Sequence, residues 1–220
     1  MPDTRGRHAA PGHAKRTLGW LAVIGVIVGA ALVVATFAFS LVVDGESMQP
    51  TLRDGDRVLL DPRPGIARIE RFDVVHALVG PGRVSVVKRV AGLPGDRVAI
   101  RPGDGERSAT VWVQPGGKGP WQAMAPASWS SDAVTRPCCA VNGTSSASVR
   151  VATVPAGHVF LLGDNLGHSD DSRVFGWVSD AEVRGRFVLR LAPFGDIGRL
   201  PSGPALSPAH DAPPGHASAS

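Results

Sequence analysis

Cysteine and lysine are scarce in this chain of 220 residues, which has two cysteines and only three lysines. Two thiols are too few for a structural zinc site, and we expect neither a metal nor another cofactor. Because Cys138 and Cys139 are sequence neighbours, the only bridge between them would be a strained vicinal disulfide. We favour the alternative, two thiols without a role in a variable loop.

Excess positive charge is missing from most of the chain, although the formal net charge is +4. Four basic residues and one acidic residue precede position 18, which leaves 19 basic and 18 acidic residues for the remainder. No basic stripe is available to bind a phosphate backbone. We therefore expect no nucleic acid partner.

Charge is absent altogether from residues 18–43, a run of 26 residues. A helix of that length exceeds the ~30 Å hydrocarbon core of a bilayer, whereas the apolar region of a cleavable signal peptide is usually about 7–15 residues long. We predict a cytoplasmic leader over residues 1–17, followed by a single transmembrane anchor in the lipid bilayer. The positive-inside bias then places the chain from Asp44 onward outside the cytoplasm of a cell membrane.

Long helical patterns are missing after the predicted anchor, where 27 glycines and 19 prolines in the whole chain favour turns. Runs such as "FDVVHALV" and "VSVVKRVAG" are rich in β-branched residues and are separated by Gly and Pro, as short strands joined by tight turns would be. The sequence predicts a mostly β fold of antiparallel sheets. Residues 44–101 and 151–199 would form one β domain.

Two segments lack this strand pattern. We interpret residues 102–150 as an irregular insertion, with a hairpin around Val111 to Val113 as one option. Residues 200–220 are rich in Pro, Ala, Ser and His, cannot bury apolar surface, and are predicted to be a disordered tail. Three tryptophans of the insertion would lie either at the bilayer interface or in a local core: Trp112, Trp121 and Trp129.

A histidine placed as in a catalytic triad is also missing, so a serine nucleophile would need another base. Lys88 is the best candidate, because Lys15 lies in the leader and Lys118 is flanked by glycines. Strand alternation in "VSVVKRV" puts Lys88 on a face with valines and Arg89 on the opposite face. Burial among aliphatic side chains would lower its pKa. An edge-strand lysine that discourages aggregation is the alternative.

Four segments resemble the ordered motifs of type I signal peptidases of the Gram-positive, actinobacterial type. They are "GESMQPTL", "GDRVLLD", "VVKRVAGLPGD" and "GDNLGHSDDSRVFGWV", and they follow the predicted anchor. The resemblance implies a signal-peptidase-like β domain. It also implies a membrane-bound serine endopeptidase that removes signal peptides from exported preproteins by a Ser-Lys dyad and an acyl-enzyme.

The resemblance assigns roles to individual residues. Ser47 matches the nucleophile, Lys88 the general base, and Ser169 the serine whose hydroxyl helps to orient the lysine. Asp171 and Arg173 match an ion pair that braces the loop of Ser169. The residues that match the shallow apolar substrate pockets are Val43, Met48, Leu52, Val86 and Val87.

Two further positions lie in these motifs. Asp164 lies in the "GDN" turn and matches a supporting residue. Gly45 stands where Gram-negative members carry a serine whose hydroxyl helps to form the oxyanion hole, so catalysis here would depend on backbone donors or water.

Two alternative functions remain. A self-cleaving repressor-type Ser-Lys peptidase would be soluble and would carry a DNA-binding domain, for which we see no segment. An inactive protein that captures signal peptides without cutting them would not need Ser47, Lys88 and Ser169, which are all present. The sequence does not predict the oligomeric state.

Overall fold

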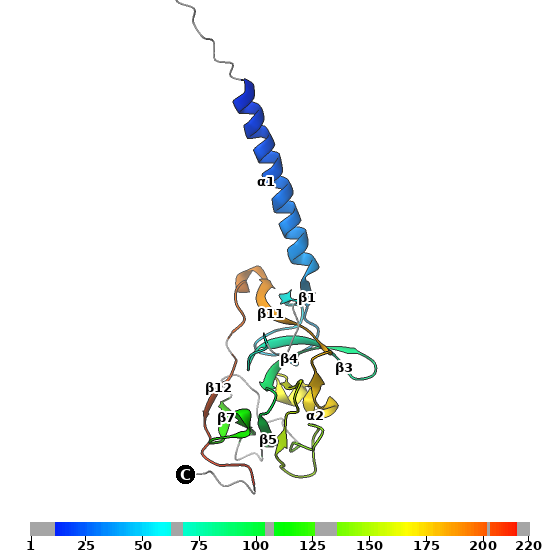
Figure 1. Ribbon diagram of the computed structural model, residues 1–220, viewed down its shortest axis with the longest axis vertical. Coiled ribbons are helices and arrows are strands. Elements are labelled where there is room, and N and C mark those ends of the chain that lie inside the picture. The colour runs from blue at the N-terminus through cyan, green and yellow to red at the C-terminus, as the bar shows by residue number, and fades with distance from the viewer. Residues whose placement is uncertain (1–11, 63–67, 104–107, 126–135, 202, 215–220) are drawn as a thin grey trace, which may run out of the picture. The chain divides into compact units, whose positions relative to one another are not determined.

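The computed structural model describes residues 12–62, 68–103, 108–125, 136–201 and 203–214. The chain divides into two compact units, with the boundary between Phe39 and Ser40. Figure 1 shows a long helix in the first unit and a β fold in the second.

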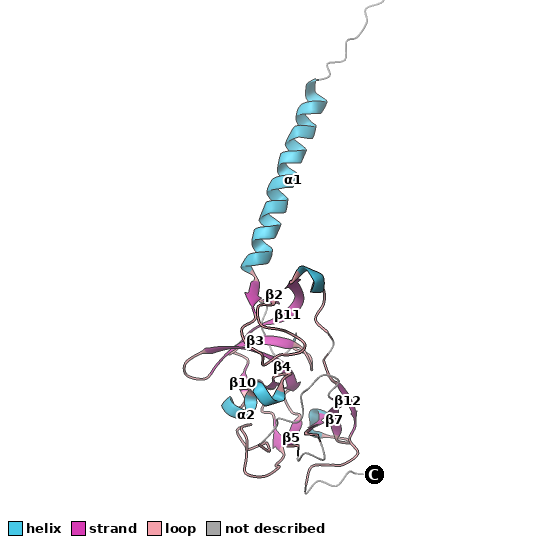
Figure 2. Cartoon of the chain, turned by 180° about the vertical axis from the view of Figure 1, so that it is seen from behind, coloured by secondary structure: helices cyan, strands magenta, loops and turns pink. Residues whose placement is uncertain are grey.

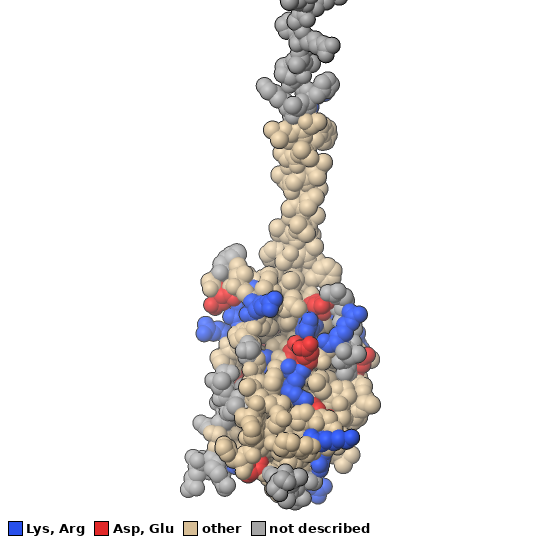
Figure 3. All heavy atoms as spheres, turned by 60° about the vertical axis from the view of Figure 1, so that its left-hand side comes forward, with Lys and Arg blue, Asp and Glu red and all other residues tan. Residues whose placement is uncertain are grey.

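The first unit contains one described helix, α1 (Gly12–Ala38). Its part Arg16–Ala38, 23 residues with mean hydropathy 2.7, is long and apolar enough to cross a membrane. Figure 3 shows neutral side chains along the visible face of this helix. The predicted apolar helix is therefore confirmed, but it ends at Ala38 instead of Val43. Residues Ser40–Val42 form a strand, because an uncharged, β-branched sequence suits a strand as well as a helix.

The second unit begins with a seven-stranded antiparallel sheet (Figure 2). In sheet order its strands are β1 (Ser40–Val42), β2 (Arg57–Asp61), β11 (Val183–Ala192), β3 (Val74–Val79), β4 (Val84–Gly92), β9 (His158–Leu162) and β10 (Val178–Ser179). The segments "VVHALV" and "VSVVKRVAG" pair as β3 and β4, with Val75 opposite Lys88. Both strands thus match the predicted β-branched runs.

A second antiparallel sheet has five strands. In sheet order they are β12 (Ala205–Pro208), β7 (Gln122–Ala125), β6 (Thr110–Gln114), β5 (Arg97–Arg101) and β8 (Ala152–Thr153). One apolar cluster contains Val98 and Ile100 of this sheet together with Phe160 and Leu162 of the first sheet. This shared core joins the two sheets, and the mostly β prediction is confirmed.

Short helices fill several connections. They are η2 (Pro115–Gly117), η4 (Leu166–His168), α2 (Ser172–Phe175) and η5 (Phe194–Asp196). The elements η4 and α2 follow β9 directly, so the predicted "GDN…SDDSR" segment forms one compact loop beside β4 and β9.

The predicted irregular insertion is wrong for residues 110–125, where β6 and β7 extend the second sheet. The option of a hairpin around Val111 to Val113 is confirmed, because β6 pairs antiparallel with β5 and β7. Trp112 and Trp121 are 1% and 4% exposed and pack together, so the local-core alternative holds for them, while Trp129 lies outside the described residues. The predicted disorder of the tail is wrong for Ala205–Pro208, which pairs with β7 as β12. An edge strand needs only backbone hydrogen bonds to an existing sheet, so a composition poor in large apolar residues does not prevent it.

Cys138 and Cys139 form a vicinal disulfide, and both are buried. Our preference for two thiols without a role is therefore wrong. The Cys138 N–H donates to the Ile100 carbonyl (3.0 Å), and the Cys139 N–H donates to the Arg150 carbonyl (2.8 Å). The bridge thus fixes the segment that leads from the second sheet towards α2.

Candidate active site

Ser47 lies in a tight turn between β1 and β2. The next residues anchor this turn, because Met48 and Leu52 are buried in one apolar cluster and the Leu52 N–H donates to the Met48 carbonyl (2.9 Å). Gly45 enters the turn with φ of +92°, a conformation that glycine adopts without steric cost, and its N–H donates to Asp54 Oδ1 (2.9 Å). The apolar anchoring after Ser47 and the hydrogen bond of Gly45 before it hold the turn that presents the Ser47 hydroxyl.

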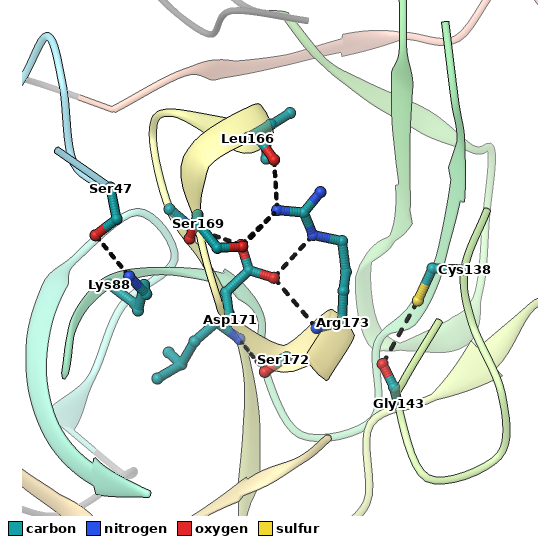
Figure 4. Close-up of polar contacts among 11 residues, drawn as sticks. Ser47, Lys88, Cys138, Gly143, Leu166, Ser169, Asp171, Ser172 and Arg173 are labelled. Atoms are coloured by element: carbon teal, nitrogen blue, oxygen red, sulfur yellow. Dashed lines mark hydrogen bonds and ion pairs between the residues drawn. The ribbon is translucent and has the colours of Figure 1, made fainter. Parts of the chain in front are cut away.

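Lys88 of β4 meets this hydroxyl. Its Nζ donates to Ser47 Oγ over 2.6 Å, although 41 residues separate the two in sequence (Figure 4). The lysine is only 4% exposed. Burial lowers the pKa of Lys88 below its usual value of 10.5, the charge of Arg173 lowers it further, and the nearby Asp171 and Asp170 oppose the shift. A buried lysine with a lowered pKa, in contact with a serine hydroxyl, has the geometry of a nucleophile and its base.

Ser169 follows η4 on the loop that borders the dyad. Its Oγ is buried and has no hydrogen-bond partner in the described structure. Gly163 lies close to both serines. A Cβ atom added at Gly163 would overlap Ser169 Oγ and would lie 2.5 Å from the Ser47 carbonyl oxygen. The structure thus brings Ser169 next to the backbone of Ser47, and an orienting role for its hydroxyl stays a prediction.

Asp171 and Arg173 form the predicted ion pair. Arg173 Nη2 lies 2.7 Å from Asp171 Oδ2, and Arg173 Nε donates to Asp171 Oδ1 (2.8 Å). Arg173 Nη2 also donates to the carbonyls of Leu166 (2.8 Å) and Ser169 (3.3 Å), while the Gly163 N–H donates to Asp171 Oδ2 (3.1 Å). Figure 4 shows this pair beside Ser169. One carboxylate and one guanidinium therefore hold both ends of the loop that carries Ser169.

The chain is similar to known proteins over most of its length. Residues 17–192 match the family model described as "Signal peptidase, peptidase S26". The chain belongs to the signal peptidase S26 family.

Individual members of the S26 family are similar to most of the chain. A protein named signal peptidase I from Bacillus caldolyticus is 31% identical over 187 residues, which cover 82% of this chain and 93% of that protein. A signal peptidase IB from Staphylococcus aureus is 30% identical over 190 residues, covering 83% and 93%. A crystal structure of a signal peptidase I from Enterococcus faecalis V583 is 29% identical, with a TM-score of 0.34, and covers 56% of this chain and 98% of that chain.

Sequence reasoning missed one ion pair of this S26 site. Arg89 and Asp164 are 2% and 1% exposed, and Arg89 donates to both carboxylate oxygens, from Nε (2.7 Å) and from Nη2 (2.6 Å). The guanidinium also donates to the Phe72 carbonyl (2.7 Å). The sequence held a partial signal for this pair, because Arg89 was predicted on the face of its strand opposite Lys88. A buried guanidinium needs a carboxylate partner, and the "GDN" turn contains one in Asp164.

Asn165 is a second residue that sequence reasoning did not single out. Its backbone N–H donates to the Ser47 carbonyl (3.0 Å), and its side-chain amide donates to the Glu46 carbonyl (3.3 Å). The "GDN" turn thus holds the nucleophile turn from the other side. An asparagine in a turn of this kind was the only signal in the sequence.

The predicted substrate-pocket residues of this S26 member are only partly brought together. Val43, Met48 and Leu52 are buried in one cluster, and the half-buried Val87 packs against it. Val86 packs against a different cluster, because neighbouring residues of β4 point to opposite faces. These five assignments remain predictions.

Proposed function

We propose that this chain removes signal peptides from exported preproteins, with Ser47 as nucleophile and Lys88 as general base. The contact between Lys88 Nζ and Ser47 Oγ over 2.6 Å, in a buried setting, carries the proposal. Membership of the signal peptidase S26 family and the names of the similar Bacillus and Staphylococcus proteins support it.

The reaction would proceed by acyl transfer. Neutral Lys88 accepts the proton of the Ser47 hydroxyl while Ser47 Oγ attacks the scissile carbonyl. The resulting lysine ammonium returns the proton to the leaving amine, which becomes the N-terminus of the mature protein. Water, deprotonated by Lys88, then hydrolyses the acyl-enzyme and releases the signal peptide.

The oxyanion of the intermediate needs donors at Ser47 itself. Gly45 has no hydroxyl, and its N–H is already directed to Asp54. The backbone N–H of Ser47 donates to no group in the described part of the chain, and we assign it to the oxyanion. Asn165 would hold this backbone segment in place through its bond to the Ser47 carbonyl.

A free strand edge next to Lys88 offers a place for the substrate. Strand β3 pairs with β4 along Val84–Arg89, whereas β9 pairs with β4 only at Arg89 and beyond. Among the described strands, none pairs with the second edge of residues Val84 to Lys88. An extended signal peptide can add to such an edge by backbone hydrogen bonds, which would bring its cleavage site to the dyad.

The membrane position is also a proposal. The apolar helix Arg16–Ala38 would be the single anchor, with the basic leader in the cytoplasm and the β unit outside. Enzyme and membrane-bound preprotein would then meet within the same bilayer, which raises their effective concentration.

Cleavage of a preprotein by the purified full-length chain in detergent tests the proposal, with the new N-terminus identified by mass spectrometry. Wild type should release the signal peptide, and Ser47→Ala should not, while both give the same circular dichroism spectrum. The matched control is Ser207→Ala in β12, which should cleave normally because β12 belongs to the other sheet. An intact preprotein with folded wild-type enzyme would instead favour the capture protein.

A further inference from the structure

A groove with a volume of about 580 Å³ opens beside Ser169. One wall is the catalytic loop after β9, and the other is the segment that follows Arg136. Its polar lining consists of Arg136, Thr144, Ser145, Ser169, Asp170 and Arg173.

Both walls of this groove are fixed by hydrogen bonds. The Ser145 N–H donates to the Arg173 carbonyl (2.8 Å), which joins the second wall to α2. Arg173 in turn holds Leu166 and Ser169 of the first wall. The disulfide of Cys138 and Cys139 lies at the base of the segment that forms the second wall. The groove is therefore formed before a substrate arrives.

The groove continues the path of the proposed substrate. A peptide along the free edge of β4 cannot follow that strand past Lys88, because β9 pairs with β4 from Arg89 onward. Figure 4 shows Ser47 and Lys88 on one side of Ser169, and Arg173 and Gly143 on the other. A substrate peptide that continues past the dyad, away from the free edge of β4, would therefore pass Ser169 and reach the groove.

We propose that this groove binds the first residues of the mature protein, on the leaving-group side of the cut, and that Arg136 selects an acidic side chain there. The proposal rests on the peptidase function proposed above. It adds a specificity site for the mature protein, on the C-terminal side of the cleaved bond.

The preference for an acidic side chain would come from the charged residues of the groove. Arg173 is engaged with Asp171, whereas Arg136 is exposed and forms no ion pair with any residue that the structure describes. Asp170 is also exposed, and it directly follows Ser169 on the wall that borders the dyad. Arg136 is then the cation available to a carboxylate farther from the cut.

The test compares peptide substrates with one shared signal side and six mature-side residues, carrying either Glu or Lys at each mature position in turn. Full-length wild-type enzyme in detergent should prefer Glu over Lys at one or more of these positions, by about 2- to 5-fold in kcat/KM, the size expected for an exposed ion pair. Arg136→Glu should reverse that preference. Arg199→Glu, a control at another exposed arginine outside the groove, should retain it.

Two results would overturn the inference while leaving the peptidase function intact. They are cleavage by wild type without any Glu or Lys preference, and a preference that Arg136→Glu does not change. Failure of wild type to cleave any of the peptides or the full preprotein would overturn the peptidase function itself, and the inference with it.

Discussion

Asp164 accepts hydrogen bonds from Nε and Nη2 of Arg89 on the face of β4 opposite Lys88. Lys88, the residue before Arg89 in the same strand, contacts Ser47. The Arg89 charge is thereby paired on the face away from Lys88, which would have to lose its proton in the proposed mechanism.

Removal of Asp164 should be costly for stability. Asp164→Ala leaves the buried Arg89 guanidinium without its carboxylate, and we expect the free energy of unfolding to fall by about 3 to 5 kcal/mol. Denaturant titration followed by tryptophan fluorescence measures this change. Asp196→Ala is the control, because Asp196 is exposed and lies 3.8 Å from Arg190, so its loss should cost less than about 1 kcal/mol. Equal effects of the two variants would contradict the role of the buried pair.

The cleavage rate should depend on the protonation state of Lys88. Its pKa is lowered by burial, and only the neutral amine can accept the Ser47 proton, so the rate should rise with pH as Lys88 deprotonates and reach a plateau above that pKa. A pH profile of kcat/KM on one peptide measures the limb. Lys88→Arg keeps a charge that does not titrate in this range and should be inactive though folded. Substantial cleavage by folded Lys88→Arg would contradict the assignment.

Gly163 should tolerate no side chain. A methyl group there would overlap Ser169 Oγ and press on the Ser47 carbonyl, so Gly163→Ala must shift the nucleophile turn or the loop. Overpacking of this kind costs about 1 to 3 kcal/mol, and we expect kcat to fall by at least about 10-fold. Gly195→Ala, where an added Cβ meets nothing within 4 Å, should cleave as wild type does. A fully active Gly163→Ala enzyme would show that this close approach is dispensable.

Gly45 should not accept a serine freely. A serine at position 45 would carry the hydroxyl that helps to form the oxyanion hole in Gram-negative members, but φ of Gly45 is +92°. Strain of about 1 to 3 kcal/mol should therefore lower kcat in both Gly45→Ser and Gly45→Ala. If Gly45→Ser instead matched or exceeded wild type in single-turnover cleavage, the turn would be more adaptable than this conformation implies.

Much of the site could be predicted because its residues stand in short local patterns. Strand alternation around Lys88 placed it among valines, and the structure confirms its burial and its contact with Ser47. The pairing of Arg89 with Asp164 was not predicted, because strand alternation indicates that Arg89 needs a carboxylate but not which one, and 75 residues separate the two.

The second sheet was harder to predict for a different reason. Its strand β6 stands between a Gly-rich stretch and "PGG", and β12 lies in a segment rich in Pro and Ala. Their pairing depends on backbone hydrogen bonds, which any composition can make. Burial of Trp112 depends on residues of the tail, whose carbonyl at Asp211 accepts the indole N–H (3.0 Å).

Strand β12 and the residues after it cover part of the second sheet, so truncation of the gene before them should destabilise the product. Ala209 and Ala212 of the tail pack against the cluster of Trp112 and Trp121, only a few residues before the chain ends. A premature stop codon after Leu200 would spare every codon of the dyad and its loop, yet its product would expose two tryptophans and an unpaired edge of β7. Cellular proteases remove such partly unfolded products, so we expect a null allele from a truncation that deletes no catalytic residue.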